Sequence, residues 1–243
     1  MKNAKRSRPF LASLAVAAFV AVTGTADISR AGQDVPAEPY LHKSSDGTRG
    51  VRFSETALYD VEVWDLKANK RLSSITGLAG VVNAADISPD GKKVVTGERN
   101  GLVGLWDADT GKELKLIKGH TDQVHDVRFS ANGTAIASGA RDGTARTWDA
   151  ETGEQLVQHQ QKGGSYIDVV SFSPDGRYVL SAGNGWADLW DARSGAVISS
   201  TLVGPEDEGG FTTFAHISPD GKAILVTDDD KVTKTIPIKL PAE

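Results

Sequence analysis

Short runs of hydrophobic residues, separated by turn-forming residues, extend along most of the chain, and residues 119–159 show this pattern most completely. There, an apolar run ends at Ser130 and is followed by Ala131-Asn132-Gly133, which favours a tight reversal because Asn and Gly accept left-handed backbone conformations. The pattern predicts four short antiparallel strands, at residues 124–130, 135–138, 144–148 and 155–159. One such sheet cannot bury both of its faces by itself, so neighbouring copies must stack against it.

The pattern recurs at a fixed period. The dipeptide Trp-Asp occurs four times with successive copies 42 residues apart, at Trp64-Asp65, Trp106-Asp107, Trp148-Asp149 and Trp190-Asp191. The second and fourth units also contain the turn sequence Ser-Pro-Asp-Gly, and a fifth unit has this turn at residues 218–221 but lacks Trp-Asp. A period of this length, with Gly119-His120 at the start of the third unit and Trp-Asp near its end, is typical of four-stranded propeller blades.

These motifs resemble those of the WD40 repeat family, most closely from Val81 to Leu202. The resemblance implies an all-β fold, a β-propeller of WD40 type in which each unit forms one blade. About five units can be counted over residues 51–240, and the first and last of them are incomplete.

The first unit is short because Ser54 precedes Trp64 by only 10 residues, whereas Ser130 precedes Trp148 by 18. About one strand and one turn are therefore missing, and residues 51–54 are either the inner strand of this unit or a strand that belongs to another blade. The last unit ends without an outer strand. Its final strand carries Pro237, which cannot donate a backbone hydrogen bond and so suits a sheet edge.

WD40 rings are closed by an N-terminal strand that completes the last blade, and residues 51–64 are candidates for that strand. The units predict either a small closed ring or an open arc. We favour an arc, or an imperfect ring that closes weakly or by self-association, because exposed strand edges invite pairing with another chain.

By resemblance to the family, a buried tetrad of hydrogen-bonded side chains is expected in the third unit, formed by His120, Asp142, Ser138 and Trp148. In such a tetrad the carboxylate orients the imidazole, the imidazole meets the hydroxyl, and the hydroxyl meets the indole N–H. Because the hydroxyl is then occupied, we interpret these residues as structural and not as a hydrolase triad. The second unit keeps Thr96 and Trp106 but has Leu78 and Asn100 at the other two places, and the fourth keeps Ser181 and Trp190 with Asn184 and no His.

Composition and the N-terminus extend this picture. The chain has 243 residues, a net charge of −5 and no cysteine, which excludes disulfides and thiolate zinc sites. The absence of a basic stripe argues against nucleic acid as the main partner.

Residues 1–26 have the parts of a secretory signal: four cations, an acid-free apolar run over residues 10–22, and small residues before Ala26. We expect cleavage after Ala26, or alternatively after Ala31, and loss of the four cations changes the net charge from −5 to −9. The apolar run is shorter than the roughly 20 residues of a spanning helix, so an uncleaved anchor is less favoured. Residues 27–50 are expected to form a flexible lead-in.

No motif for catalysis, cofactor binding or metal binding is found in the sequence. The acidic run from Asp228 to Asp230 lacks the alternating ligand spacing of a calcium loop and is interpreted as a solvated turn. His125 is expected to pack beside Val127 and Phe129, and three other histidines have no spacing that suggests a shared metal ion: His42, His159 and His216.

The loops at one end of the blades are the expected binding rim, and they present these residues: Glu98, Arg99, Arg141, Trp186, Glu206, Asp207, Glu208 and Asp228 to Asp230. A Trp exposed among charges is a common binding anchor, although Trp186 packed against its neighbouring blade is an equal alternative.

The sequence therefore predicts a secreted or periplasmic scaffold without catalytic activity, which binds a protein or peptide on its rim. It predicts no nucleic-acid partner and no membrane contact after signal cleavage, with a homo-oligomer as a further expectation. Two alternatives remain: a propeller enzyme, of hydrolase or lactonase type, with its site at the ring axis, and a cytosolic adaptor whose N-terminus only resembles a signal.

Overall fold

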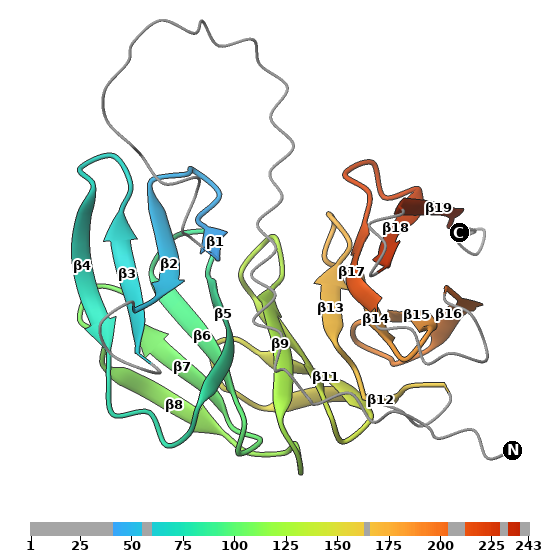
Figure 1. Ribbon diagram of the computed structural model, residues 1–243, viewed down its shortest axis with the longest axis horizontal. Helices are drawn as coiled ribbons and strands as arrows, with labels where there is room; N and C mark the ends of the chain where they lie inside the picture. The colour runs from blue at the N-terminus through green and yellow to red at the C-terminus, as the bar shows by residue number, and fades with distance from the viewer. Residues whose placement is uncertain (1–40, 55–59, 163–165, 204–211, 229–232, 239–243) are drawn as a thin grey trace, which may run out of the picture. The chain divides into compact units, whose positions relative to one another are not determined.

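The computed structural model describes residues 41–54, 60–162, 166–203, 212–228 and 233–238, and all structural statements below concern these residues. They form five antiparallel sheets that follow one another in chain order (Figure 1). The first contains β1 (His42–Lys43), β2 (Arg49–Phe53), β3 (Val61–Asp65) and β4 (Lys70–Ile75). The second contains β5 (Val82–Ile87), β6 (Lys93–Glu98), β7 (Val103–Asp107) and β8 (Glu113–Ile117). The third contains β9 (Val124–Phe129), β10 (Ala135–Ala140), β11 (Thr144–Asp149) and β12 (Gln155–Gln160). The fourth contains β13 (Val169–Phe172), β14 (Tyr178–Gly183), β15 (Trp186–Asp191) and β16 (Val197–Leu202). The last contains β17 (Thr212–Ile217), β18 (Ala223–Asp228) and β19 (Thr233–Pro237).

Each sheet is a meander in which strands adjacent in sequence are paired, so the predicted all-β propeller fold of WD40 type is confirmed. The turn between the first two strands of each sheet is built in the same way. In the third sheet, Ser130 Oγ accepts a hydrogen bond from the backbone N–H of Ala135 at 3.0 Å, and Gly133 has a φ of 71°, which favours glycine. Equivalent serines stand at this turn in the other four sheets, at Ser44, Ser88, Ser173 and Ser218.

The hydrophobic core lies between consecutive sheets. Each of the four contacts between neighbours buries apolar side chains from both sheets, and each inner strand packs on the inner strand of the next sheet. Trp106, Trp148 and Trp190 lie in the contacts between the first and second, second and third, and third and fourth sheets respectively. Stacking therefore buries the faces that a single meander would leave exposed, as the repeat pattern requires.

The first sheet differs from the prediction for its unit. Its inner strand is β1, only two residues long, and residues 51–53 belong to the second strand, β2. The turn serine is Ser44 and not Ser54, because Ser44 Oγ accepts the N–H of Arg49 at 3.0 Å as Ser130 does that of Ala135. The missing strand is thus present upstream, and residues 41–50, expected in the flexible lead-in, are part of the sheet.

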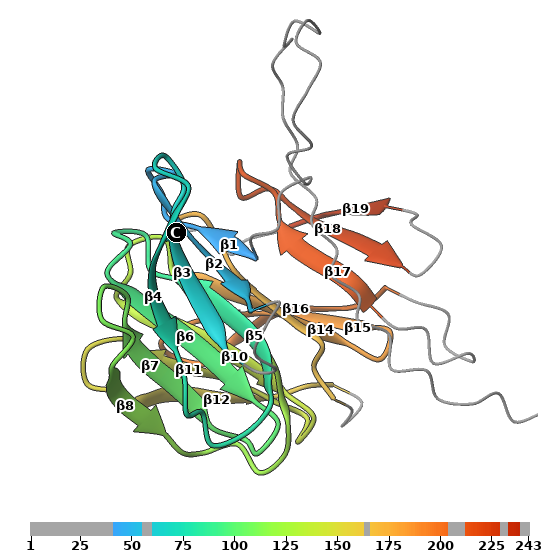
Figure 2. The same ribbon diagram turned by 60° about the vertical axis from the view of Figure 1, so that its left-hand side comes forward.

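Among the described residues the last sheet has three strands, in the order β17-β18-β19. Within the described residues none of its strands is hydrogen-bonded to the first sheet, so the five sheets form an open arc (Figures 1 and 2). The expectation that residues 51–64 complete the last blade is wrong for the described part of that range, because β2 and the start of β3 pair within the first sheet.

The predicted signal, residues 1–26, and the rest of the lead-in to residue 40 lie outside the described residues. No helix in the described part of the chain is long and apolar enough to span a membrane.

Candidate functional site

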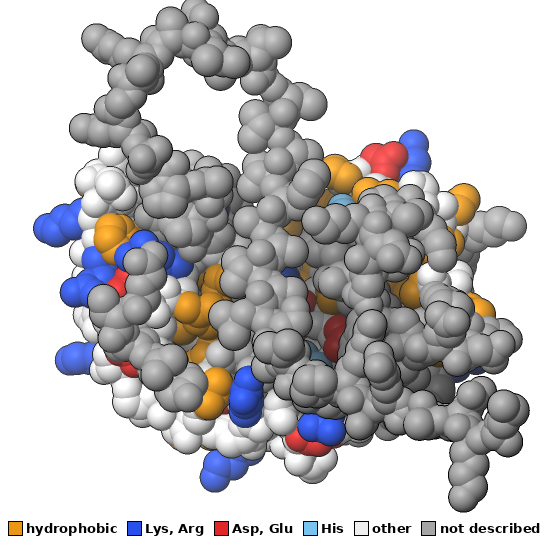
Figure 3. Space-filling model, viewed as in Figure 1, with side chains coloured by type: hydrophobic (Ala, Val, Ile, Leu, Met, Phe, Trp, Pro, Cys, Tyr) orange, Lys and Arg blue, Asp and Glu red, His pale blue; other side chains and the backbone are white. Residues whose placement is uncertain are grey.

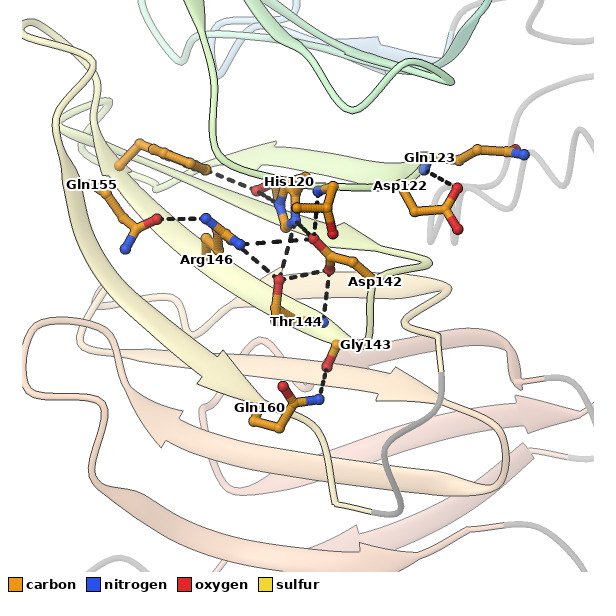
Figure 4. A network of polar contacts seen from close by, with 12 residues as sticks. His120, Asp122, Gln123, Asp142, Gly143, Thr144, Arg146, Gln155 and Gln160 are labelled. Atoms are coloured by element: carbon orange, nitrogen blue, oxygen red, sulfur yellow. Dashed lines mark hydrogen bonds and ion pairs between the residues drawn. The ribbon is translucent and has the colours of Figure 1, made fainter.

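The third sheet contains a buried chain of hydrogen bonds that links the strand ends to the loops (Figure 4). Trp148 Nε1 donates to Ser138 Oγ at 2.8 Å, Ser138 Oγ lies 2.7 Å from His120 Nε2, and His120 Nδ1 lies 3.0 Å from Asp142 Oδ2. Ser138 and Trp148 are almost fully buried, and the His120 side chain is buried as well. The structure therefore brings together the four residues expected to form the tetrad.

The direction of the hydrogen bonds follows from the indole, which can only donate. Ser138 Oγ accepts from Trp148, so its own hydrogen points to His120 Nε2, and Nδ1–H of His120 then donates to Asp142. Burial lowers the pKa of His120, which keeps the imidazole neutral. Burial also acts to raise the pKa of Asp142, but hydrogen bonds from His120, Thr144 and Thr121 outweigh it and hold that pKa below its usual range. A serine oxygen enclosed in this way has no path to a substrate.

The network extends beyond the tetrad through residues that the motif did not predict. Thr144 Oγ1 donates to Asp142 Oδ1 at 2.7 Å, and Arg146 Nε donates to Thr144 Oγ1 at 3.2 Å. Arg146 also reaches Gln155 Oε1, at 2.8 Å, in the outer strand β12. One network thus connects the β8–β9 loop, the β10–β11 hairpin and the sheet edge, and it holds the loops at this end of the sheet.

In the second and fourth sheets the tryptophan N–H also donates to a hydroxyl oxygen, although the histidine is missing. Trp106 donates to Thr96 Oγ1 at 2.9 Å, and Trp190 donates to Ser181 Oγ at 3.2 Å. In the fourth sheet the place of the missing histidine is filled by Gln161, whose Oε1 accepts from Ser181 Oγ at 2.8 Å. The sequence interpretation did not identify Gln161, because an amide at this place does not match the family motif.

The first sheet has a charged network in place of the tetrad. Trp64 Nε1 donates to Glu62 Oε2 at 2.9 Å, and Glu62 also accepts hydrogen bonds from Arg52 and Arg71, at 2.9 and 3.0 Å. The Arg52 guanidinium lies over the Trp64 ring, 4.2 Å from its centroid. Glu62 is buried, and its two oxygens are fully engaged by these partners.

Two further carboxylates join neighbouring inner strands. Asp86 on β5 accepts the backbone N–H of Phe129 on β9 at 2.7 Å, and Asp126 on β9 accepts that of Val170 on β13 at 3.0 Å. Burial raises the pKa of Asp86 to about 6 and also raises that of Asp126. Arg128 pairs with Asp126 at 3.0 Å, and His42 lies 3.8 Å from Asp86. These side chains hold successive sheets together through their inner strands.

The loops and hairpins at one end of the sheets form the rim, defined here by residues 76–81, 99–102, 118–123, 141–143, 160–162, 166–168 and 184–186. Backbone hydrogen bonds fix it: Arg99 N donates to Val81 O, and Arg141 N donates to Gln123 O, both at 2.8 Å. Both arginines are exposed at the places predicted for them.

The rim differs from the prediction at Glu98, which is fully buried and not exposed. Its Oε2 accepts from Asn100 Nδ2 at 3.1 Å, while Oε1 has no hydrogen-bond partner among the described residues, and burial raises the pKa of the carboxyl group. Glu98 lies two residues after Thr96 in β6, and alternate residues of a strand share a face, so its side chain points to the same side of the sheet as that of Thr96.

Trp186 is half-buried. The ammonium nitrogen of Lys162 lies 4.3 Å from its ring centroid, and its backbone carbonyl accepts from Gln161 Nε2. The remaining predicted rim residues are not placed: Glu206, Asp207, Glu208, Asp229 and Asp230 lie outside the described residues, as do the side-chain surroundings of Asp228.

His125 contacts two residues of the rim. It is half-buried at the inner margin of the rim, where Nδ1 lies 3.4 Å from Asp168 Oδ1 and the ring meets Tyr166 edge-on. His159 instead forms a buried pair with Asp188 at 2.9 Å and stacks on Trp190. Among the described residues no group of three or more His, Asp or Glu side chains is arranged to hold a metal ion.

Comparison with known families agrees with this geometry. The model of the WD domain, G-beta repeat, matches residues 69–107, 111–149 and 154–191. Each match covers the outer strand of one sheet and the first three strands of the next, so the sequence repeat is offset by one strand from the structural blade. The chain thus carries three WD40 repeats, and such repeats generally mark protein-interaction scaffolds that are typically not enzymes. No sequence among the curated proteins matches this chain.

Proposed function

We propose that this chain is an exported scaffold without catalytic activity, which binds a protein or peptide partner on its rim. The observation that carries the proposal is that exposed side chains are presented from a fixed backbone. Arg141 is 58% exposed in its side chain, yet its backbone is bonded to Gln123, and the next residue, Asp142, is tied into the buried tetrad. A rigid loop with exposed anchors lowers the entropy lost on binding.

The geometry of the tetrad supports the non-catalytic part of the proposal. A serine nucleophile needs a free hydroxyl and donors for a developing oxyanion. Ser138 Oγ is fully buried and already bonded to both Trp148 and His120.

The rim is tested by comparing the proteins that the mature chain and its variants retain from an extract of the source organism. Arg141→Ala combined with Trp186→Ala should remove a discrete set of retained proteins. Arg193→Ala, which changes an exposed arginine in the turn between β15 and β16, serves as the matched control. Retention of the same set by the rim variant and the wild type would contradict docking on the rim.

Export is tested by N-terminal sequencing of the protein purified from its natural source. Cleavage should leave Asp27 as the first residue. A soluble chain that starts at Met1 would support the cytosolic adaptor instead, and an uncleaved chain in the membrane fraction would support an anchor.

The enzyme alternative has one observation in its favour, the His125–Asp168 pair beside Tyr166 at the inner margin of the rim. A histidine oriented by a carboxylate can act as a general base. Hydrolysis of ester or lactone substrates by the wild type, abolished by His125→Ala, would replace the scaffold proposal with this one.

We also propose self-association, because β19 is an edge strand of the last sheet within the described residues. Light scattering of the mature chain should show a concentration-dependent increase in mass above that of the monomer. A strict monomer that resists proteolysis would contradict this part of the proposal.

A further inference from the structure

Four of the five sheets have an outer strand, β4, β8, β12 or β16, which is paired on one side only within the described residues. Such an edge can pair with another chain, and charged side chains on the edge strand oppose this. Three of the outer strands contain titratable side chains: Lys70 and Arg71 in β4, Glu113 and Lys115 in β8, and His159 in β12. Figure 3 shows Lys and Arg side chains along the left-hand margin of the molecule, where Figure 1 places β4. The strand β16 contains no titratable side chain.

The difference is clearest at one position of the repeat. In each of these sheets one residue of the outer strand is paired with the Trp-Asp tryptophan, and this residue is Arg71, Glu113, Gln155 or Val197. Val197 is 52% exposed. An exposed apolar residue therefore stands in β16 where the other three outer strands have a charged or amide side chain. The sequence is uncharged from Ser194 to Pro205, on both sides of this strand.

The backbone of β16 presents hydrogen-bonding groups at its free edge. Val203 N donates to Gly185 O at 2.7 Å, so this pair is bonded to the β15 side. Opposite residues in an antiparallel ladder alternate between bonded and non-bonded pairs, and Thr201 is in the next bonded pair. The N–H and C=O groups of Ser200 and Leu202 therefore point away from β15.

We propose that β16 pairs in antiparallel orientation with β16 of a second copy of this chain, so that Ser200 of each copy exchanges backbone hydrogen bonds with Leu202 of the other. The proposal rests on the self-association proposed above and names the strand that mediates it. The edge strand β19 is less suited, because it contains Lys234 and Pro237, and proline cannot donate a backbone hydrogen bond.

The composition of β16 favours a second copy as the occupant of this edge. Antiparallel pairing of a strand with itself has two-fold symmetry, so the strand meets its own residues. Like charges that face each other across two strands are destabilising, and β16 contains none. In the proposed pairing Thr201 lies beside Thr201 of the second copy, and pairs of threonines across neighbouring strands are favourable.

The test is light scattering of the mature chain over a range of concentrations, for the wild type and for Ser200→Pro. Proline at this position removes the outward N–H but no bond to β15, and an edge strand accepts proline where its N–H faces solvent. The matched control is Ser74→Pro, at the equivalent position of β4. The wild type should approach twice the monomer mass as its concentration rises. Ser200→Pro should raise the dissociation constant about tenfold, since each copy loses one donor.

A second pair of variants covers the case in which proline prevents folding. Leu202→Lys gives β16 the residue that β8 has two repeats earlier, Lys118, and Thr76→Lys is the corresponding control next to β4. Leu202→Lys should also weaken the dimer, because a lysine on an edge strand opposes pairing, and Thr76→Lys should not. Urea midpoints equal to that of the wild type establish that the variants are folded.

The outcomes separate this surface from self-association in general. A dimer that is unchanged in Ser200→Pro and Leu202→Lys, or one that the controls weaken equally, would overturn the assignment to β16 and leave self-association in place. A wild type that remains monomeric would overturn both. If this monomer bound a partner protein that Ser200→Pro did not bind, a strand of that partner would replace the second copy as the occupant.

Discussion

Replacement of Asp86 by Asn should change how the stability of the protein depends on pH. The Asp86 carboxylate is buried on the inner strand β5 and accepts two backbone N–H groups, from Phe129 at 2.7 Å and from Ile87 at 2.8 Å. Burial raises its pKa to about 6, against 3.8 for the free side chain, and only the charge of Arg128 and the hydrogen bonds oppose this. The charged form is thus less favourable in the folded protein than in the unfolded chain.

The direction and the size of this pH dependence follow from proton linkage. Because the folded-state pKa of Asp86 is raised, its contribution to stability is fully present below about pH 4 and is lost as the pH rises through about 6. A difference of about two pKa units corresponds to about 3 kcal/mol, of which about 2–3 kcal/mol develops between about pH 4 and about pH 8. Asparagine is neutral throughout. It offers one carbonyl oxygen for two N–H groups, which costs about 1–3 kcal/mol at every pH.

The measurement is urea unfolding of the wild type and of Asp86→Asn across this pH range. The free energy of unfolding of the variant, relative to the wild type, should increase by about 2–3 kcal/mol from about pH 4 to about pH 8. Glu154→Gln changes an exposed carboxylate and controls for the loss of surface charge. A difference between Asp86→Asn and the wild type that stays constant with pH would refute the reasoning, because it would mean that Asp86 titrates alike in both states.

Three further predictions concern the tryptophan networks. Trp148→Ala should lower the free energy of unfolding by about 3–5 kcal/mol, because it removes a large buried aromatic side chain, and an unchanged urea midpoint would contradict the tetrad assignment. Burial acts to raise the pKa of Asp142, but hydrogen bonds, led by that from His120, lower it below the value of the free side chain, so the carboxylate stabilises the fold above about pH 4 and loses this effect on further acidification. The melting temperature of Asp142→Asn should therefore fall less with acid pH than that of the wild type. An equal fall in both proteins would count against this. Gln161→Ala should lower the free energy of unfolding by about 1–3 kcal/mol, because the Ser181 hydroxyl loses its acceptor. Gln158→Ala, at an exposed position, should have little effect. Equal changes in urea midpoint for the two variants would show that Gln161 does not fill the place of the histidine.

The middle of the fold could be predicted from the sequence because local signals there agree with one another. In the third unit the strands predicted at 135–138, 144–148 and 155–159 lie within β10, β11 and β12. Turn residues, hydrophobic alternation and the Trp-Asp period all indicate the same boundaries. Because the third unit matches the family motif throughout, the motif also indicates which four side chains meet in the tetrad.

The first sheet could not be predicted in the same way, because its inner strand is unusually short and a contact that fixes this strand is distant in sequence. A two-residue inner strand gives no hydrophobic pattern, and its place is fixed in part by the backbone bond from Ser45 to Pro89 in the next sheet. Ser54 precedes Trp64 closely enough to be mistaken for the turn serine, although the true equivalent is Ser44. For this reason the sequence pattern predicts a start at residue 51, whereas the sheet begins with β1 at His42.

Glu98 shows a different kind of error, because a signal was available. The sequence pattern assigns Glu98 to the rim because it counts this residue as part of a loop at one end of the blades. The family motif, however, places the side chain of Thr96 beside that of Trp106, and residues two apart in a strand lie on the same face. Strand alternation therefore predicts the burial that the structure shows, and it outweighs the charge of the residue.

The four Trp-Asp tryptophans show which feature of the repeat is constant, the position of the indole, and which feature varies, the acceptor of its N–H. The period of 42 residues fixes the position of each indole, whereas its N–H is satisfied by a hydroxyl in three sheets and by Glu62 in the first. A buried donor must have an acceptor, but any acceptor at the right distance meets that need. In the second, third and fourth sheets the indole lies in the buried contact with the preceding sheet, and its acceptor is a neutral hydroxyl. An ion pair would be costly to bury in such a contact. Among the described residues no sheet precedes the first one. Its indole donates to the buried Glu62, which is paired with Arg52 and with the exposed Arg71. An ion pair with one exposed partner is less costly to bury than one enclosed between two sheets.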